Sequence, residues 1–251
     1  MIDIHSHILP GLDDGAGSPE ESLAMLRMAA AAGTTDIVAT PHANHEYRFD
    51  PALVEREIAR LQAAVGDTPQ IHYGCDFQLT PENIADAIRS PGKYSIDHRA
   101  YLLVEFSDFL IPKTTAEIFA RLIGAGLRPI VTHPERNQLL QSRIEELAGW
   151  VAKGALIQVN AQSMLGLFGK PAKAAAHQLM IGGMVHFLAS DAHDLEYRTT
   201  ALDAAWRYVE ANFGAEAAVR VLEENPRAVL AGVPLNPAPY ALKKRKWFGL
   251  W

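Results

Sequence analysis

Short apolar runs alternate along most of this chain with longer segments in which apolar residues recur every three or four positions. Each short run is rich in Ile, Val and Leu and is bounded by turn-forming residues, which is typical of a strand buried on both faces. The predicted strands span residues 2–5, 36–40, 71–75, 101–105, 128–132, 156–160 and 185–190.

The longer segments have the period of amphipathic helices. The first is the clearest, because Ser18 suits the N-cap, Pro19 suits the first helical position, Glu21 completes a capping box and Gly33 ends the run. Further helices are predicted at residues 51–65, 114–125, 143–153, 171–181 and 201–212.

Regular alternation of strand and helix predicts an α/β protein with a parallel sheet. Seven such units without an obvious linker favour a barrel over two lobes, and a doubly wound open sheet is the alternative. We expect a single barrel domain over residues 1–236, followed by a tail at 237–251 that begins near two prolines.

Composition narrows the class of protein. The 251 residues are 49% hydrophobic and 21% charged, ordinary values for a globular protein, and the net charge of −6 argues against nucleic acid as a partner. Cys75 is the only cysteine, so no intramolecular disulfide can form and a reducing compartment is favoured. The first residues lack a signal-peptide pattern, and apolar stretches such as 182–189 are too short to span a bilayer. We therefore expect a cytoplasmic protein.

Most of the predicted strands stop at, or just before, a residue that can bind a metal ion. These residues are His5, His7, His42, Asp76, Glu105, His133, Asn160, Asp191 and His193. Successive positions are roughly thirty residues apart, about one strand–helix unit. In a parallel barrel they would share the rim at the carboxyl ends of the strands, where catalytic groups gather.

The residue types at this rim indicate metal chemistry. His5 and His7 are two positions apart, so their imidazoles point the same way along a strand and can share one ion. Imidazole and carboxylate ligands without thiolates suit Zn, Mn or Fe, and the number of candidates favours two or three ions. Taken singly, each residue has an ordinary explanation as a core histidine, an ion-pair partner or a helix cap. Four histidines that do not lie at strand ends, His72, His98, His177 and His186, keep that ordinary interpretation.

Two arginines indicate the class of substrate. Arg136 lies three residues after His133, and Arg198 lies shortly after His193. Guanidinium groups beside metal ions suit the peripheral oxygens of a phosphoryl group. Pro81 stands where a thiolate phosphatase loop would place an arginine after Cys75, and neither a nucleotide phosphate loop nor a serine elbow is present. A covalent route is therefore disfavoured, and Cys75 is predicted to be a small buried hydrophobe.

Five motifs give the chain a family resemblance. They are the segment from Asp3 to Gly15, Thr40-Pro41-His42, Val104-Glu105-Phe106, His133-Pro134-Glu135-Arg136 and Ser190-Asp191-Ala192-His193. Together they resemble the polymerase and histidinol phosphatase (PHP) superfamily, and within it the bacterial protein-tyrosine phosphatases encoded with capsule and exopolysaccharide systems.

The resemblance implies a distorted seven-stranded (β/α)7 barrel with a centre of two to three divalent ions, commonly manganese, with Fe, Zn or Mg as alternatives. The ligands it implies are His5, His7, His42, Glu105, His133, Asp191 and His193, and Arg136 and Arg198 would hold the phosphate. The family usually places a bridging Glu after the third strand, where this chain has Asp76. The implied reaction is hydrolysis by an activated water, without a covalent enzyme intermediate.

The implied substrate is the phosphotyrosine tail of a membrane-associated tyrosine kinase. A small-molecule phosphatase such as histidinol phosphatase, a nuclease-like phosphoesterase and a non-catalytic metal-bound interaction module are the alternatives. The end of the chain, with cations at 243–246 followed by aromatic residues, could make a peripheral membrane contact, be a solvated disordered end, or form a contact in an oligomer.

Overall fold

The computed structural model describes residues 1–239. The predicted tail therefore lies outside the described residues except for 237–239, and the domain division at residue 236 stays a prediction. Within the described part, no helix combines the length and the apolar character that crossing a membrane requires.

Nine parallel strands form two sheets in residues 1–239. They are β1 (Ile2–Ser6), β2 (Asp36–Ala39), β3 (His42–Ala43), β4 (Gln70–Tyr73), β5 (Asp76–Gln78), β6 (Tyr101–Glu105), β7 (Arg128–Thr132), β8 (Leu156–Asn160) and β9 (Phe187–Ala189). The first sheet has the order β1-β2-β4 and the second has the order β3-β5-β6-β7-β8-β9. The predicted α/β class with parallel strands is confirmed.

The predicted count of seven strands is not confirmed, because two short strands, β3 and β5, follow the predicted strands at 36–40 and 71–75. Between β2 and β3 the chain passes through Pro41, which has no N–H to donate to a ladder. Between β4 and β5 it passes Gly74, where a Cβ would lie 2.7 Å from Val38 Cγ1. At both points the chain leaves the first sheet and enters the second.

The two sheets approach each other again beside β1 without forming a continuous ladder in the described residues. The N–H of Asp191 donates to the His5 carbonyl at 2.8 Å, and that of His7 donates to the Ala192 carbonyl at 2.9 Å. Ser6 and Ala192 form an isolated parallel bridge. These contacts bring the end of β9 against the end of β1.

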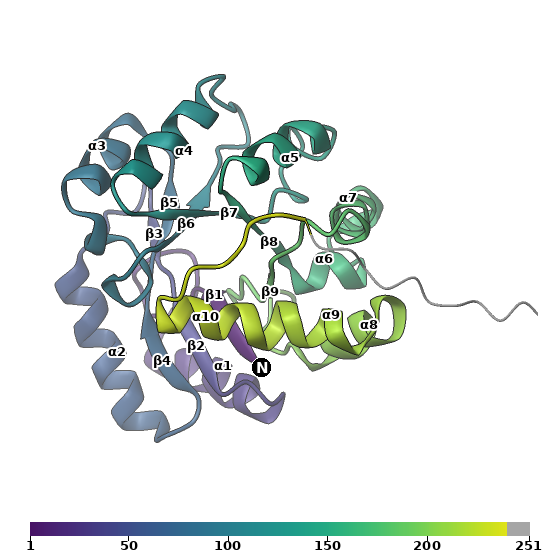
Figure 1. Cartoon of the computed structure of the whole chain (residues 1–251). Helices are drawn as coiled ribbons and strands as arrows, with labels where there is room; N and C mark the ends of the chain where they lie inside the picture. Colours follow the sequence, from purple (N-terminus) through teal and green to yellow (C-terminus); the bar gives the residue numbers. More distant parts are fainter. Residues whose placement is uncertain (240–251) are drawn as a thin grey trace, which may run out of the picture.

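Helices cover the outer faces of the strands (Figure 1). They are α1 (Pro19–Ala31), α2 (Pro51–Val65), α3 (Pro81–Arg89), α4 (Thr115–Gly124), α5 (Ile144–Ala152), α6 (Ala161–Leu165), α7 (Gly169–Ile181), α8 (Asp203–Phe213), α9 (Ala215–Val219) and α10 (Asn225–Ala231), with short turns η1 (Pro91–Lys93), η2 (Ile96–His98) and η3 (Arg220–Glu224). The six predicted helices are all present, and α3, α6, α9, η3 and α10 were not predicted.

The start of α1 follows the sequence prediction with one difference. Ser18 is the N-cap, and its side chain accepts a hydrogen bond from the N–H of Glu21. The carboxylate of Glu21 accepts from the N–H of Gly17 at 2.8 Å, so it does not close the capping box on Ser18 as expected. One half of the predicted box is therefore formed.

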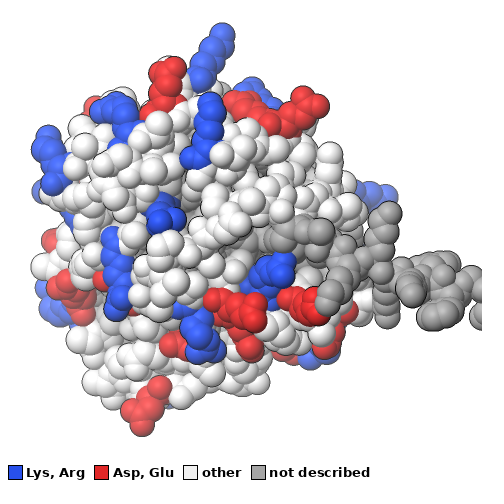
Figure 2. All heavy atoms as spheres, viewed as in Figure 1, with Lys and Arg blue, Asp and Glu red and all other residues white. Residues whose placement is uncertain are grey.

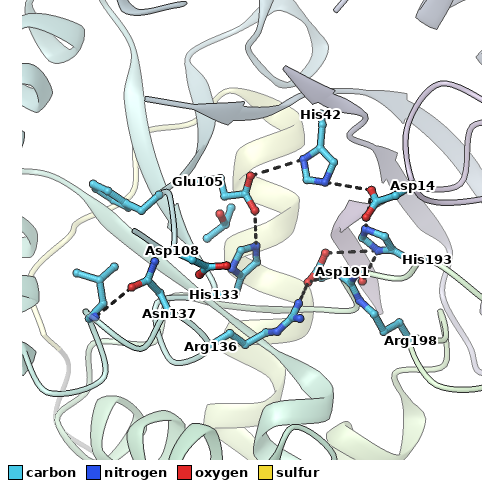
Figure 3. Close-up of a pocket in the computed structure, with 13 residues that line it drawn as sticks. Asp14, His42, Glu105, Asp108, His133, Arg136, Asn137, Asp191, His193 and Arg198 are labelled. Carbon is cyan, nitrogen blue, oxygen red and sulfur yellow. Dashed lines mark hydrogen bonds and ion pairs between the residues drawn. The ribbon is translucent and has the colours of Figure 1, made fainter. Parts of the chain in front are cut away.

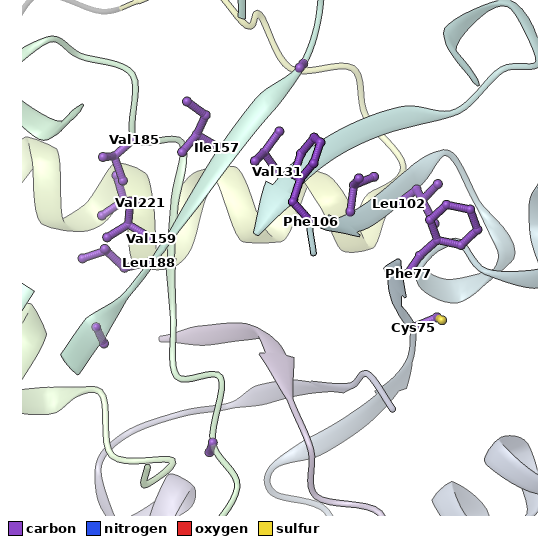
Figure 4. Close-up of a cluster of buried hydrophobic side chains, with 14 of the residues drawn as sticks. Cys75, Phe77, Leu102, Phe106, Val131, Ile157, Val159, Val185, Leu188 and Val221 are labelled. Carbon is purple, nitrogen blue, oxygen red and sulfur yellow. The ribbon is translucent and has the colours of Figure 1, made fainter. Parts of the chain in front are cut away.

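Alternate residues of the strands enter two apolar clusters. One lies between strands and helices and includes Cys75, Leu102 and Val131 (Figure 4), so Cys75 is a buried free thiol as predicted. The other takes the opposite faces, such as Leu103 and Ile130, and is completed by Val229 of α10. On the face in Figure 2 acidic and basic side chains are mixed, with no large patch of one sign.

Candidate metal centre

We call the second apolar cluster, with Leu103, Ile130 and Val229, the inner cluster. On the side of the strands that forms this cluster, the side chains change from apolar to polar toward the carboxyl ends of the strands. In β6, Tyr101 and Leu103 belong to the inner cluster, and Glu105 lies two positions further along the same side. In β8, Leu156 is followed on the same side by Gln158 and Asn160, which are both fully buried. The inner space is therefore an apolar core at one end and a polar site at the other.

The eight predicted metal ligands come together at this polar end. Four overlapping groups each place ligand atoms within 4.8 Å of one another: His7, Asp14, His42 and His193; His5, His7 and Asp76; His5, His133 and Asp191; and His42, Asp76 and Glu105. Residues from β1, β3, β5, β6 and the segments after β7 and β9 thus share one site, although they lie far apart in the sequence.

Each of the first two histidines is oriented by a hydrogen bond from its far ring nitrogen. His7 Nδ1 lies 2.7 Å from Asp13 Oδ2, and His5 Nδ1 lies 3.0 Å from Gln158 Oε1. Their Nε2 atoms face each other at 3.2 Å. Metal-binding histidines commonly have this arrangement, in which an oxygen holds one ring N–H and leaves the other nitrogen directed at the ion.

Several buried polar atoms at the centre have no hydrogen-bond partner in the described residues. They are both carboxylate oxygens of Asp76, Nδ1 of His42 and Nε2 of His193. Asp76 is fully buried, with Oδ2 3.3 Å from His42 Nδ1 and 3.6 Å from His5 Nε2. Unpaired buried polar groups are costly, and divalent cations would satisfy them, so the donor set fits a metal centre.

Burial and nearby charged groups shift the pKa values of Glu105, His5 and His7. Burial and the charge of Asp76 raise the pKa of Glu105 to about 8. Burial alone would lower the pKa of His5, but the charges of Asp76 and Asp191 raise it to about 9. Burial and the neighbouring His193 lower the pKa of His7 to about 3, so this imidazole stays neutral as a ligand must.

Both arginines predicted from the sequence reach the same carboxylate. Arg136 Nη1 and Arg198 Nη2 each lie 2.7 Å from Asp191 Oδ2, and Asn160 Nδ2 donates to that oxygen at 2.7 Å. The other oxygen, Oδ1, lies 3.5 Å from His7 Nε2. Asp191 therefore joins the histidine cluster to the arginines.

A cavity of about 180 Å³ opens over this arrangement (Figure 3). Its lining is mostly charged or polar and comprises Asp14, His42, Glu105, Phe106, Asp108, Thr132, His133, Arg136, Asn137, Leu140, Asp191, His193 and Arg198. The arginines lie on one side and Glu105 and His42 on the other, so a small anion in the cavity would touch both.

Two residues of the centre have backbone conformations that are rare for residues with a Cβ. His133 has φ of +31° and Asp191 has φ of +49°. Such strain concentrates at functional sites, because surrounding contacts must hold it. At His133 the next turn is held by Glu135, whose Oε1 accepts from the N–H of Asn160 and the hydroxyl of Ser163.

The sequence did not indicate the roles of Asp13 and Asp14. Asp13 orients His7 and also accepts from the N–H of His42 at 3.1 Å, while Asp14 Oδ1 lies 3.3 Å from His42 Nε2 and 3.4 Å from His193 Nε2. The feature of the sequence that could have indicated them is a pair of adjacent acidic residues in a loop with several glycines. A Cβ at Gly15 would lie 2.1 Å from the carbonyl oxygen of His7, which shows how closely this loop folds back.

The four histidines that were not predicted to lie at strand ends are outside the four groups of candidate ligands, as expected. His72 lies between Asp36 and Asp97, and His98 pairs with Glu55. His177 contacts the hydroxyl of Tyr208, and His186 binds backbone groups.

Comparison with known proteins gives one consistent family. The family model for capsular polysaccharide synthesis, CpsB/CapC, matches residues 1–231. The tyrosine-protein phosphatase YwqE of Bacillus subtilis (strain 168) is 34% identical over 100% of both chains. The tyrosine-protein phosphatase CpsB of Streptococcus pneumoniae is 30% identical over 92% of this chain and 98% of its own.

Comparison with solved structures leads to the same family. A crystal structure from work on YwqE and CpsB as metal-dependent tyrosine phosphatases has a TM-score of 0.89 at 32% identity, covering 98% of this chain and 100% of that one. A β-aspartyl dipeptidase from Fervidobacterium islandicum AW-1 has a TM-score of 0.57 at 15% identity over 94% of this chain and 75% of its own, a likeness of fold alone.

Proposed function

The chain belongs to the CpsB/CapC family of capsular polysaccharide synthesis, and we propose that it is a metal-dependent tyrosine-protein phosphatase. The family resemblance predicted from the motifs is thereby confirmed. The observation that carries the activity is the joint geometry of the centre. Unpaired ligand atoms of His42 and His193, with those of the neighbouring Asp76, lie at a cavity that Arg136 and Arg198 also line.

We propose that two to three divalent cations, with manganese favoured, bind the four overlapping groups. The proposed ligands are His5, His7, His42, Asp76, Glu105, His133, Asp191 and His193, joined by Asp14. Bound there, such cations supply Lewis-acid chemistry, which lowers the pKa of water toward neutrality and offsets the charge of the phosphoryl group. Asp76, where the family usually has Glu, lies close enough to His5 and His42 to belong to two of the groups.

The chain's own groups bind and orient the substrate. Arg136 and Arg198 would grip the peripheral oxygens of the phosphoryl group, and their shared contact with Asp191 fixes both guanidinium groups beforehand. Asp13 and Gln158 hold the rings of His7 and His5 in the orientation that ligands need. A phenol leaving group has a pKa of about 10, so it can depart without a general acid from the protein.

The proposed substrate is the phosphotyrosine tail of a membrane-associated tyrosine kinase that controls capsular or exopolysaccharide synthesis. The curated relatives are tyrosine phosphatases, and the family model is one of capsule synthesis, which supports this choice. We propose that the reaction takes place in the cytoplasm, where such a tail would lie. The basic segment at 243–246 lies outside the described residues, and its role in a membrane contact stays a prediction beside that of a terminus without such a role.

The test is hydrolysis of a phosphotyrosine peptide by protein that is stripped of metal and then reloaded with manganese. We expect stripping to abolish the activity and manganese to restore it in wild type. Manganese-loaded His5→Ala should have a kcat/KM at least about a hundredfold below that of manganese-loaded wild type. Lys113→Ala, on the loop before α4, serves as a surface control.

Parallel assays with histidinol phosphate and a short oligonucleotide define specificity. Equal rates on all three substrates would contradict a tyrosine phosphatase and favour a general phosphoesterase. Retention of manganese without hydrolysis of any of them would favour a non-catalytic metal-bound module.

A further inference from the structure

Large apolar side chains are exposed on the segments between β6 and α4, between α6 and α7, and between β9 and α8. Phe109 is 94% exposed, Leu110 65%, Leu167 67% and Tyr197 78%. We call these four residues the apolar rim. Single exposed apolar residues are common, but a group of them around one cavity is typical of an interaction surface.

Each loop of the apolar rim also supplies a residue of the catalytic cavity or a contact to it. Phe109 directly follows Asp108 and Tyr197 directly precedes Arg198, and both of these neighbours line the cavity. Leu167 directly precedes Phe168, whose ring lies 4.3 Å from the guanidinium carbon of Arg136. Because consecutive Cα atoms are about 3.8 Å apart, the backbone at Phe109, Leu167 and Tyr197 lies next to residues that line the cavity or contact its arginine.

Local hydrogen bonds fix the backbone that presents these side chains. Asp194 Oδ1 accepts from the N–H groups of Tyr197 and Arg198, at 2.6 and 3.1 Å. The N–H of Leu167 donates to the carbonyl of Gln162 at 2.9 Å, and that of Phe109 donates to Ser107 Oγ at 3.2 Å. Ordered turns therefore keep these apolar side chains exposed to solvent. Because the backbone is already fixed, binding would cost little conformational entropy there.

We propose that the apolar rim binds apolar side chains next to the phosphotyrosine in a peptide substrate. The inference rests on the proposed function and adds a sequence preference to it. The cavity of about 180 Å³ is lined mainly by charged and polar groups, so it suits the phosphoryl group and leaves the flanking residues outside. Those flanking residues would then contact the loops that carry Phe109, Leu167 and Tyr197, whose exposed side chains offer apolar surface.

The experiment compares two phosphotyrosine nonapeptides, one with Leu and Phe around the phosphotyrosine and one with Ser and Gly there, and phenyl phosphate as a substrate too small to reach the rim. We expect manganese-loaded wild type to prefer the apolar peptide by about tenfold in kcat/KM, chiefly through a lower KM. Phe109→Ser, Leu167→Ser and Tyr197→Ser should each reduce that preference about threefold, with no change on phenyl phosphate.

Ile181→Ser is the matched control. Ile181 is 68% exposed, almost the same as Leu167. It is the last residue of α7 and precedes the amino end of β9, whereas the cavity lies at the carboxyl ends of the strands. This variant should keep the full preference for the apolar peptide.

Three results would overturn the proposal. Wild type could hydrolyse both peptides equally well, or the rim variants could lose activity equally on peptide and phenyl phosphate, as for a structural role. Sedimentation could also show that the variants dissociate an oligomer while the peptide preference is unchanged, which would make the rim a contact between copies. Failure of the manganese-loaded protein to hydrolyse either peptide or phenyl phosphate would instead refute the proposed function, and with it the inference.

Discussion

At the scale of single residues, Asp13 is the clearest example of a side chain that acts through another. It is largely buried, and its carboxylate holds His7 Nδ1 while accepting from the N–H groups of Gly15 and His42. Burial opposes ionisation, but the contact with His7 lowers the pKa of Asp13, so the group is an anion at neutral pH. It therefore fixes the tautomer of His7 and the direction of Nε2.

We predict that Asp13→Ala weakens manganese binding by about 10- to 100-fold, because His7 loses the partner that orients it. Isothermal titration of metal-free protein with manganese measures the affinity. Activity should return in large part at saturating manganese, since Asp13 itself is not one of the proposed ligands. Asp13→Asn keeps an acceptor oxygen and should lose less; an unchanged affinity in Asp13→Ala would refute the positioning role.

The residues that could be predicted from the sequence are those tied to a strand. His42, Glu105 and His133 each follow an apolar run, so the parallel arrangement of strands places them on one rim. Asp13 and Asp14 lie in a loop that has no period, and only the folded loop brings them back onto His7 and His42. Long-range contacts of this kind leave no local pattern in a sequence.

At the scale of elements, the same distinction explains which parts of the fold could be predicted. β6, β7 and β8 have the expected bounds, because their apolar runs end sharply at polar residues. β3 and β5 were missed, since strands of two and three residues give no pattern of their own, and the change of sheet near Pro41 and Gly74 is visible only in the hydrogen bonding. The short α6 and α10 were missed because five to seven residues give too little periodicity.

His186 connects β8 to the segment before β9 and to the C-terminal segment. Its Nδ1 accepts from the N–H of Ile157 at 3.0 Å, and its Nε2 donates to the carbonyl of Pro237 at 3.0 Å. The ring must therefore be neutral, and burial lowers its pKa from 6.5 to about 4. Protonation would put a second N–H against that of Ile157.

This arrangement predicts a stability change with pH. The folded pKa of His186 lies below its unfolded value, so the unfolded chain binds the proton more readily and stability falls as the pH drops from 6.5 toward 4. Urea unfolding of wild type and His186→Gln should show a difference in unfolding free energy that shrinks by roughly 2 kcal/mol between about pH 7.5 and pH 4.5. A difference that is constant with pH would contradict a neutral buried His186.

At the scale of the whole molecule, the inner space has two unlike ends. Leu103, Ile130 and Phe187 pack with Val229 of α10 at one end, and this apolar cluster stabilises the strands by burial. At the other end Asp76 and Asp191 are buried anions near Glu105, whose pKa their charges help to raise. Folding thus gathers like charges that repel one another unless cations accompany them.

Metal binding should therefore stabilise the whole fold. At a manganese concentration of about 100 times Kd, one bound ion contributes about 2.7 kcal/mol, which for a chain of this length corresponds to a rise in Tm of roughly 5–10 °C. Calorimetry of stripped and reloaded protein measures the shift. His5→Ala, which removes a member of two ligand groups, should lose most of it, and His72→Gln, outside all four groups, should keep it. An equal shift in both variants would mean that the ions bind elsewhere, and the convergence of the strand ends would then not be what holds them.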